Sequence, residues 1–144
     1  MEWKKQGHRA GEGNSVEHPG RSAGARAALG HRAEEQALGL LEPHGLSLLE
    51  RNYRVARGPS RRGGEIDLVL RDRDGTLVFV EVRARRDGAM VPAAATIDAR
   101  KRGRILFAAR CYIARLPQVP PCRFDVVTVE GARVEWLQAA FDAD

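Results

Sequence analysis

The sequence is poor in aromatic side chains and in cysteine. Phe, Trp and Tyr make up 6% of the 144 residues, so rows of aromatic rings that stack on single-stranded bases are not expected. The two cysteines, Cys111 and Cys122, are not spaced as a metal site or a redox pair, which fits a reduced compartment; a disulfide between them is the alternative. The four histidines are scattered, so a zinc site is not expected.

Long hydrophobic runs are also missing. No stretch approaches the roughly 20 apolar residues that a transmembrane helix needs, and the first residues lack the apolar core of a secretory signal. We therefore expect a cytoplasmic protein that makes no contact with a membrane. Residues 1–24 are rich in small and charged residues without periodicity, and they predict a disordered N-terminal tail; residues 25–144 predict one domain.

Positive charge is what the sequence has in excess. It contains 24 Lys and Arg against 19 Asp and Glu, which gives a formal net charge of +5. Most of these cations are arginine, whose planar fork binds phosphate in a bidentate geometry. This balance favours a nucleic-acid partner, and a soluble protein that is merely basic is the alternative.

Hydrophobic periodicity predicts the order of the elements. Apolar residues recur at helical spacing over residues 25–44 and 96–115. Apolar runs bounded by turn residues predict strands over residues 46–55, 64–70, 77–83, 123–129 and 134–137. The resulting order, α-β-β-β-α-β-β, predicts an α/β fold with a mixed sheet flanked by helices. The third strand is apolar on both faces, which indicates a central position in the sheet.

Two acids on neighbouring strands could carry chemistry. The turn sequence between strands 64–70 and 77–83 predicts a hairpin in which Asp67 lies opposite or nearly opposite Glu81, with Cβ atoms about 4.5–5.5 Å apart if the two are directly paired. Ile66, Leu68 and Leu70 are expected together on the opposite face. Carboxylates this close repel each other unless a cation such as Mg²⁺ lies between them. Such an ion can activate water for phosphodiester hydrolysis.

A surface role for the two acids is the simpler alternative. Glu81 would then lie on an exposed rim of the sheet, neutralised by Arg83 or Arg85. The apolar character of the strand argues against this, and so do the many cations that surround the acids in the sequence. They are Arg54, Arg57, Arg61, Arg62, Arg83, Arg85, Arg86, Arg100, Lys101, Arg102 and Arg104. A phosphate polymer would require such cations around a metal centre.

Four segments together resemble the core of the YraN family. The hairpin carries the most specific part, Gly64-Glu65-Ile66-Asp67-Leu68-Val69 followed by Leu77-Val78-Phe79-Val80-Glu81-Val82-Arg83-Ala84-Arg85. Arg123-Phe124-Asp125-Val126-Val127 and Val134-Glu135-Trp136-Leu137 support it, and the resemblance covers about residues 30–141. That family looks like a branch of the PD-(D/E)XK nuclease superfamily. This implies a restriction-endonuclease-like fold similar to that of archaeal Holliday-junction resolvases.

The resemblance assigns roles to individual residues. Asp67 takes the motif's Asp, Glu81 takes the (D/E), and Arg83 stands where lysine is usual. Glu34 matches the acid of a G-E-x-x-A element on the first helix, although alanine replaces the glycine. An ordinary solvated glutamate is the alternative for Glu34. We therefore expect Asp67, Glu81 and Glu34 to bind Mg²⁺ or Mn²⁺, while Arg83, which cannot act as a base, stabilises the phosphate.

Three functions remain open at this point. The first is a metal-dependent endonuclease acting on DNA rather than RNA, with branched or structured DNA as one substrate class. The second is a nucleic-acid-binding module of the same fold with weak or no catalysis, and the third is an interaction protein with an acidic partner. Predicted nucleic-acid contacts are Arg61, Arg62, Arg85, Arg86 and Lys101. A solvated helix face is the alternative for Lys101, and the resemblance leaves a homodimer open.

Overall fold

The computed structural model describes residues 19–56, 63–85 and 97–143. Its elements are α1 (Pro19–Leu41), the 3₁₀ turn η2 (Glu42–His44), β1 (Ser47–Val55), β2 (Gly64–Arg71), β3 (Leu77–Ala84), α2 (Ala99–Ala114), β4 (Cys122–Glu130) and β5 (Arg133–Phe141). The predicted α/β class and element order are confirmed. None of the described helices combines the length and the apolar character of a membrane span.

Helix α1 begins before the predicted start at residue 25. Its first residue is Pro19, and proline is well suited to the first turn of a helix because it has no amide hydrogen to lose there. Residues 1–18 of the predicted tail lie outside the described residues. The two cysteines, Cys111 and Cys122, are both free, so the alternative of a disulfide is wrong.

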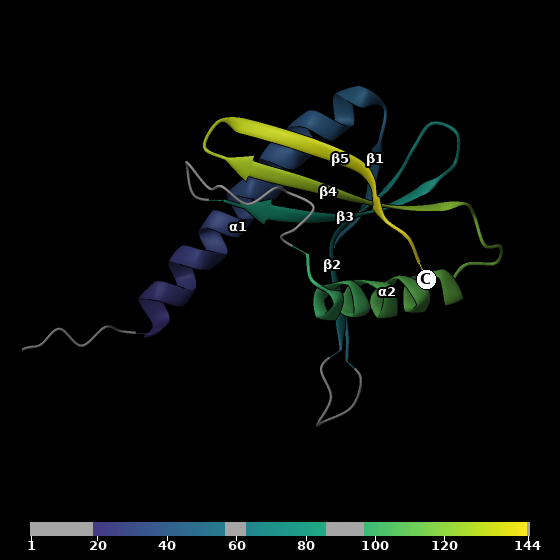
Figure 1. Ribbon diagram of the computed structural model, residues 1–144, viewed down its shortest axis with the longest axis horizontal. Coiled ribbons are helices and arrows are strands. Elements are labelled where there is room, and N and C mark those ends of the chain that lie inside the picture. Colours follow the sequence, from purple (N-terminus) through teal and green to yellow (C-terminus); the bar gives the residue numbers. More distant parts are fainter. Residues whose placement is uncertain (1–18, 57–62, 86–96, 144) are drawn as a thin grey trace, which may run out of the picture.

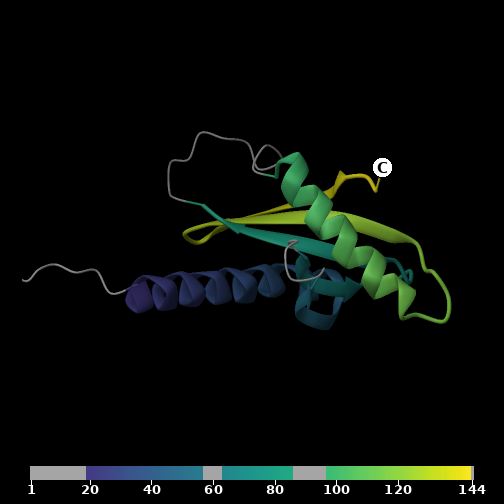
Figure 2. The same cartoon turned by 90° about the horizontal axis from the view of Figure 1, so that it is seen from below.

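The five strands form one sheet in the order β1-β2-β3-β4-β5. Strands β3 and β4 are parallel, and the other neighbours are antiparallel. Strand β3 is therefore central, as its apolar sequence predicted. The two long helices cover opposite faces of the sheet, with α1 below and α2 above in the view of Figure 2. Each helix packs on its own cluster of buried apolar side chains.

Strand β2 does not alternate as the sequence predicted. Leu68 and Leu70 pack in the α1 cluster, whereas Ile66 packs with Val69 in the α2 cluster. The expectation that Ile66 shares a face with Leu68 is therefore wrong. The reason is that the last pair between β2 and β3 joins Leu68 to Val80. Beyond this pair β2 diverges from β3, and Figure 1 shows the two strands running in different directions. We call this point the β2–β3 fork.

Helix α2 lies close to the outer end of β2. A Cβ atom on Gly64 would overlap the carbonyl oxygen of Arg104 and would lie 2.8 Å from the amide nitrogen of Ala108. Only glycine allows this approach. The helix begins after Asp98, whose side chain accepts a 2.8 Å hydrogen bond from the amide of Lys101. These contacts fix the first turns of α2 beside the fork.

Asp125, on β4, is a buried acid with a full set of partners. Its carboxylate accepts hydrogen bonds from Nε and Nη2 of Arg123, at 2.9 and 3.0 Å, and from Nε1 of Trp136 at 2.9 Å. It also accepts one from the amide of Ala139, which has a φ of 51° where the β4–β5 register shifts. The carboxylate thus stabilises the irregularity, and β5 continues to Phe141, beyond its predicted end.

Replacing Asp125 by alanine is expected to destabilise the fold. The change leaves Nε1 of Trp136 and the Ala139 amide without their acceptor, and Arg123 keeps only its 3.4 Å contact with Asp72. The free energy of unfolding should therefore fall by about 3 kcal/mol or more. Urea denaturation measures this loss. The control is Glu135→Ala on β5, because Glu135 is exposed and should contribute within about 0.5 kcal/mol. Equal losses in the two variants would contradict a structural role for Asp125.

Candidate active site

The β2–β3 fork brings together the two acids of the hairpin motif. Asp67 and Glu81 are the first residues beyond the last ladder pair, one on each strand. The carboxylate of Asp67 accepts a 2.8 Å hydrogen bond from the amide of Val82, so a side chain takes the place of the missing main-chain acceptor. Glu81 in turn is hydrogen-bonded to Asp67. The side chains therefore meet across the fork, as the hairpin register predicted.

Burial makes this acid pair electrostatically unusual. Glu81 is only 4% exposed, so its predicted alternative as an exposed rim residue is wrong. Desolvation and the negative charge of Asp67 raise the pKa of Glu81 to about 8. Desolvation also raises the pKa of Asp67, against the hydrogen bond from Val82, which lowers it. At neutral pH the pair therefore holds one proton, which Glu81 donates to Asp67.

Two cations reach the same oxygen of Glu81 from different elements. Nζ of Lys101, on α2, lies 3.3 Å from Oε2, and Nη1 of Arg83, on β3, lies 3.7 Å from it. The alternative of a solvated helix face for Lys101 is therefore wrong. The second oxygen, Oε1, is buried and accepts no hydrogen bond from the described residues. A proton shared with Asp67 or a bound cation would satisfy it.

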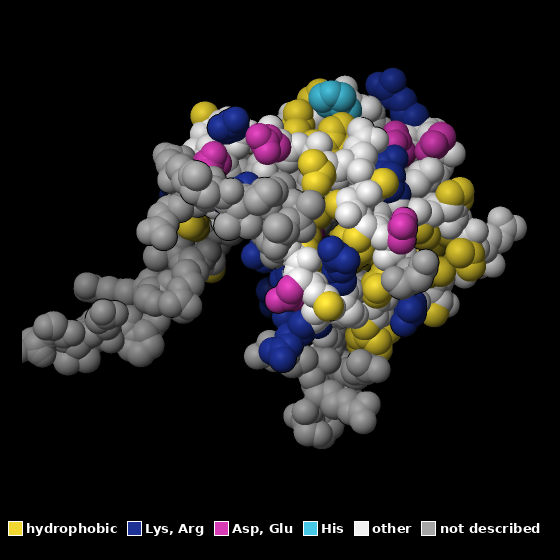
Figure 3. Space-filling model, viewed as in Figure 1, with side chains coloured by type: hydrophobic (Ala, Val, Ile, Leu, Met, Phe, Trp, Pro, Cys, Tyr) yellow, Lys and Arg dark blue, Asp and Glu magenta, His cyan; other side chains and the backbone are white. Residues whose placement is uncertain are grey.

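A small basic hollow adjoins the acid pair. Its volume is about 190 Å³, and it is lined by Arg83, Asp98, Arg100, Lys101 and Arg104. The only acid in this lining is Asp98, which is occupied in capping α2. Figure 3 shows Lys and Arg side chains gathered around the end of α2 where the helix begins. Clustered cations at a helix N-terminus attract phosphate groups. We refer to this feature as the basic hollow.

Glu34 approaches the acid pair from α1. Its Oε1 accepts a 3.4 Å hydrogen bond from Nδ2 of Asn52 on β1. Burial and the nearby charge of Asp67 raise the pKa of Glu34, while the hydrogen bond from Asn52 lowers it. Within residues 19–56, 63–85 and 97–143, however, no three Asp, Glu, His or Cys side chains form a group that could hold a metal ion. The structure thus joins two of the three predicted ligands and leaves Glu34 beside them.

The structure describes only some of the other residues that were predicted to contact nucleic acid. Arg61, Arg62 and Arg86 lie outside the described residues. Arg85 follows β3, and its amide donates a 2.8 Å hydrogen bond to the carbonyl of Val129. Sequence reasoning did not single out Asn52, and it named Arg100 and Arg104 only as part of a basic surrounding. The spacing from Lys101 to Arg104 was a usable signal, because residues three apart share a helix face.

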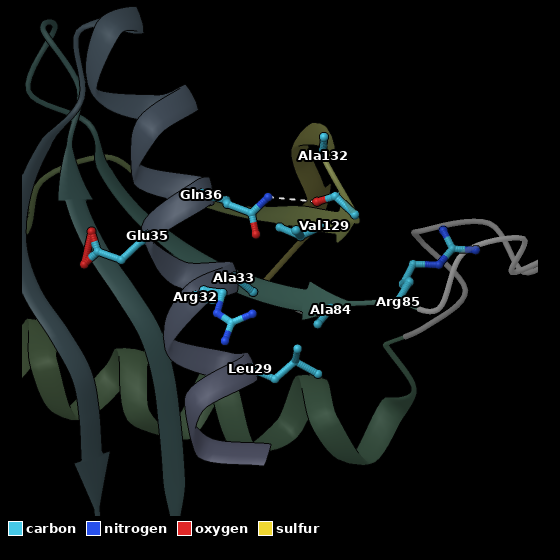
Figure 4. Close-up of a pocket in the computed structure, with 10 residues that line it drawn as sticks. Leu29, Arg32, Ala33, Glu35, Gln36, Ala84, Arg85, Val129 and Ala132 are labelled. Carbon is cyan, nitrogen blue, oxygen red and sulfur yellow. Dashed lines mark hydrogen bonds between the residues drawn. The ribbon is translucent and has the colours of Figure 1, made fainter. Parts of the chain in front are cut away.

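A larger hollow than the basic hollow lies elsewhere, between α1 and the ends of β3 and β4. It has a volume of about 820 Å³ and a largely apolar lining that includes Leu29, Ala33, Ala84 and Val129. Figure 4 shows Glu35 turned away from the other lining side chains, and its carboxylate is bound by Arg51 at 2.7 Å. Among its described lining residues this groove has no pair of converging acids, so the fork is the better candidate for chemistry.

Comparison with known proteins identifies the family. The model of the Uncharacterised protein family UPF0102 matches residues 33–129. The chain belongs to this family. UPF0102 is the YraN family, so the resemblance is confirmed, and placement in the PD-(D/E)XK superfamily is consistent with it. The matched span includes Glu34, Asp67, Glu81 and Lys101.

Several UPF0102 relatives are similar over most of the chain. One from Methylibium petroleiphilum is 60% identical over 116 residues, which covers 81% of this chain and 95% of the relative. Another from Paracidovorax citrulli is 62% identical and covers 81% of this chain and 84% of the relative. A third, from Burkholderia pseudomallei, is 52% identical and covers 86% of this chain and 82% of the relative.

The raised pKa of Glu81 predicts a specific dependence of stability on pH. In the unfolded chain Glu81 ionises near its ordinary pKa of 4.5, whereas in the folded protein it keeps its proton until about pH 8. The folded state binds more protons within this window, so the free energy of unfolding should fall as the pH rises. Glu81→Gln removes this contribution. In metal-free buffer, the free energy of unfolding of the variant relative to that of wild type should rise by at least about 1 kcal/mol from the lower to the upper end of this pH window. One pKa unit corresponds to about 1.4 kcal/mol.

Urea denaturation at about pH 5 and about pH 8.5 measures this difference. Glu135→Gln is the matched control, because it makes the same chemical change at an exposed position. A stability difference between Glu81→Gln and wild type that stays constant with pH would show that Glu81 ionises normally in the folded protein.

Proposed function

We propose that the protein is a Mg²⁺- or Mn²⁺-dependent endonuclease that cleaves phosphodiester bonds in DNA. The observation that carries this proposal is a pair of adjoining carboxylates, Glu81 buried and Asp67 half-buried, beside the basic hollow. Burying two acids together is costly unless a cation or a proton compensates their charge. Asp125 shows how this chain satisfies a structural acid, with four hydrogen bonds to one carboxylate. Glu81 has no such set of donors in the part of the chain that the structure describes.

The donors at the fork fit a hard divalent cation. Carboxylate oxygens are the protein ligands that Mg²⁺ and Mn²⁺ favour, and Oε1 of Glu81 lacks a hydrogen-bond partner among the described residues. Asp67 and Glu81 would hold the ion in place of their shared proton, with Glu34 as the third acid. A bound ion would supply Lewis acidity and lower the pKa of a coordinated water.

The cations at the fork would bind and orient the phosphate. Arg83 stays charged at any working pH and is suited to a bidentate contact with the scissile phosphate. Lys101 reaches Glu81 from α2, so a lysine is present at the acid pair although Arg83 occupies the motif's usual lysine position. We propose that Lys101 holds the attacking water against the phosphate. The remaining arginines of the basic hollow would contact the DNA backbone without reading bases.

A binding module with weak or no catalysis is the second candidate. The specific observation in its favour is Arg83, because arginine cannot give up a proton as lysine can. DNA as the substrate, and branched DNA in particular, rests on the family resemblance. The cytoplasm is the proposed compartment, and a homodimer stays a prediction.

Cleavage should depend on both acids and on a divalent ion. With Mg²⁺ or Mn²⁺, the purified protein should cut at least one of linear, nicked, flapped or four-way DNA more efficiently than the matching RNA. Asp67→Asn and Glu81→Gln should each lower kcat/KM at least about 100-fold, since loss of an outer-shell partner alone often costs about 10–100-fold. Glu135→Gln should retain full activity. Cleavage retained in both acid variants would indicate a contaminating nuclease, and salt-sensitive binding without cleavage would favour the binding module.

Lys101 should matter to chemistry more than other cations of α2 do. If Lys101 orients the attacking water, Lys101→Met should lower kcat at least about tenfold, as expected for a lost positioning contact, with a smaller change in KM. Arg110→Met is the control, because Arg110 is an exposed cation on the same helix. Single-turnover cleavage measures both. Equal effects of the two variants would show that Lys101 contributes only to the general positive charge.

A further inference from the structure

Asn52, on β1, has an unusual backbone conformation and lies opposite Asp67 on the neighbouring strand β2. The β1–β2 register pairs Arg51 with Leu68 and Tyr53 with Ile66, so Asn52 stands opposite Asp67. Its φ is 49°, in the left-handed region that residues other than glycine seldom adopt within a strand. Such conformations are costly and are concentrated at functional sites.

The other residue of this kind has a structural explanation. Among the described residues, only Asn52 and Ala139 combine a side chain with a positive φ. Ala139 lies at the register shift of β5, where its amide is held by the buried carboxylate of Asp125. Asn52 is exposed, so packing in the core does not explain its conformation.

The side chain of Asn52 is directed at an acid of the candidate site. Its Nδ2 donates a 3.4 Å hydrogen bond to Oε1 of Glu34, and the preceding Arg51 binds the next acid, Glu35, at 2.7 Å. Two successive residues of β1 thus hold two successive acids of α1. Arg51 forms its ion pair with Glu35, whereas Asn52 holds Glu34 with an uncharged donor.

We infer that Asn52 is a positioning residue that holds the carboxylate of Glu34 beside Asp67 and so completes the cation site. This inference rests on the proposed function. A third carboxylate next to Asp67 and Glu81 is repelled before a cation binds, so it needs a donor that keeps it close. An amide is suited to this task, because it holds Glu34 without bringing a further positive charge to a site that Lys101 and Arg83 already reach. Asparagine also tolerates the left-handed backbone better than most residues do.

The test distinguishes the contribution of the side-chain amide of Asn52 from that of its backbone conformation. Asn52→Gly accepts the same φ and should keep the metal-free melting temperature, but it lacks the donor. We expect the Mn²⁺ concentration that gives half-maximal thermal stabilisation to rise at least about tenfold, as for other lost second-shell contacts. Ala139→Gly is the matched control, because it makes a similar change at the other positive-φ position, and it should bind Mn²⁺ as wild type does.

A second comparison tests whether Asn52 acts through Glu34. Glu34→Gln should weaken Mn²⁺ binding, and adding Asn52→Gly to it should cause no further loss, because residues that act as a unit are not additive. Additive losses would overturn the inference, and so would normal Mn²⁺ binding by Asn52→Gly. If wild type itself is not stabilised by Mn²⁺, the proposed cation site fails at Asp67 and Glu81, before Asn52 is considered.

Discussion

The hydrogen bond from the amide of Val82 to the carboxylate of Asp67 is the contact on which the site depends. Strands β2 and β3 separate after the pair Leu68–Val80, and a main-chain donor of β3 then needs an acceptor that β2 no longer supplies. Asp67 supplies it, which places a carboxylate inside the sheet next to Glu81. The parallel connection from β3 to β4 must also leave from this end of β3, so α2 begins here and brings Lys101 to the same acid. The separation of the strands and the start of α2 therefore bring the acids and Lys101 to the same place.

The chain contains two kinds of buried acid, and their difference supports the functional interpretation. The carboxylate of Asp125 binds a guanidinium, an indole and a main-chain amide, and it stabilises the irregular path of β5. Glu81 is similarly buried, yet one of its oxygens has no donor among the described residues and its closest acidic neighbour raises its pKa. An acid of the first kind is explained by the fold. An acid of the second kind costs stability, and binding of a cation gives a physical reason to retain it.

The sequence predicted the parts of this arrangement that depend on local patterns. The turn and the two-residue period placed Asp67 opposite Glu81, and the apolar run placed β3 at the centre of the sheet. The sequence could not show that Ile66 turns to the α2 cluster, because this depends on where β2 separates from β3, which the local pattern does not reveal. The contact of Lys101 with Glu81 and the left-handed backbone of Asn52 were equally hidden, since both arise only when distant elements pack together. The role predicted for Glu34 came mainly from the family resemblance.

The charges at the fork imply that the proposed cation and a phosphate would bind cooperatively. With one proton between them, Asp67 and Glu81 carry a single negative charge, which faces the positive charges of Arg83 and Lys101. Replacing this proton by a divalent ion makes the fork more positive, although the carboxylates then carry their full charge. A phosphodiester in the basic hollow would offset the excess, so each ligand should strengthen the binding of the other by the same factor. The raised pKa of the acid pair would then reflect a site whose charges are neutralised only when metal and nucleic acid are both bound.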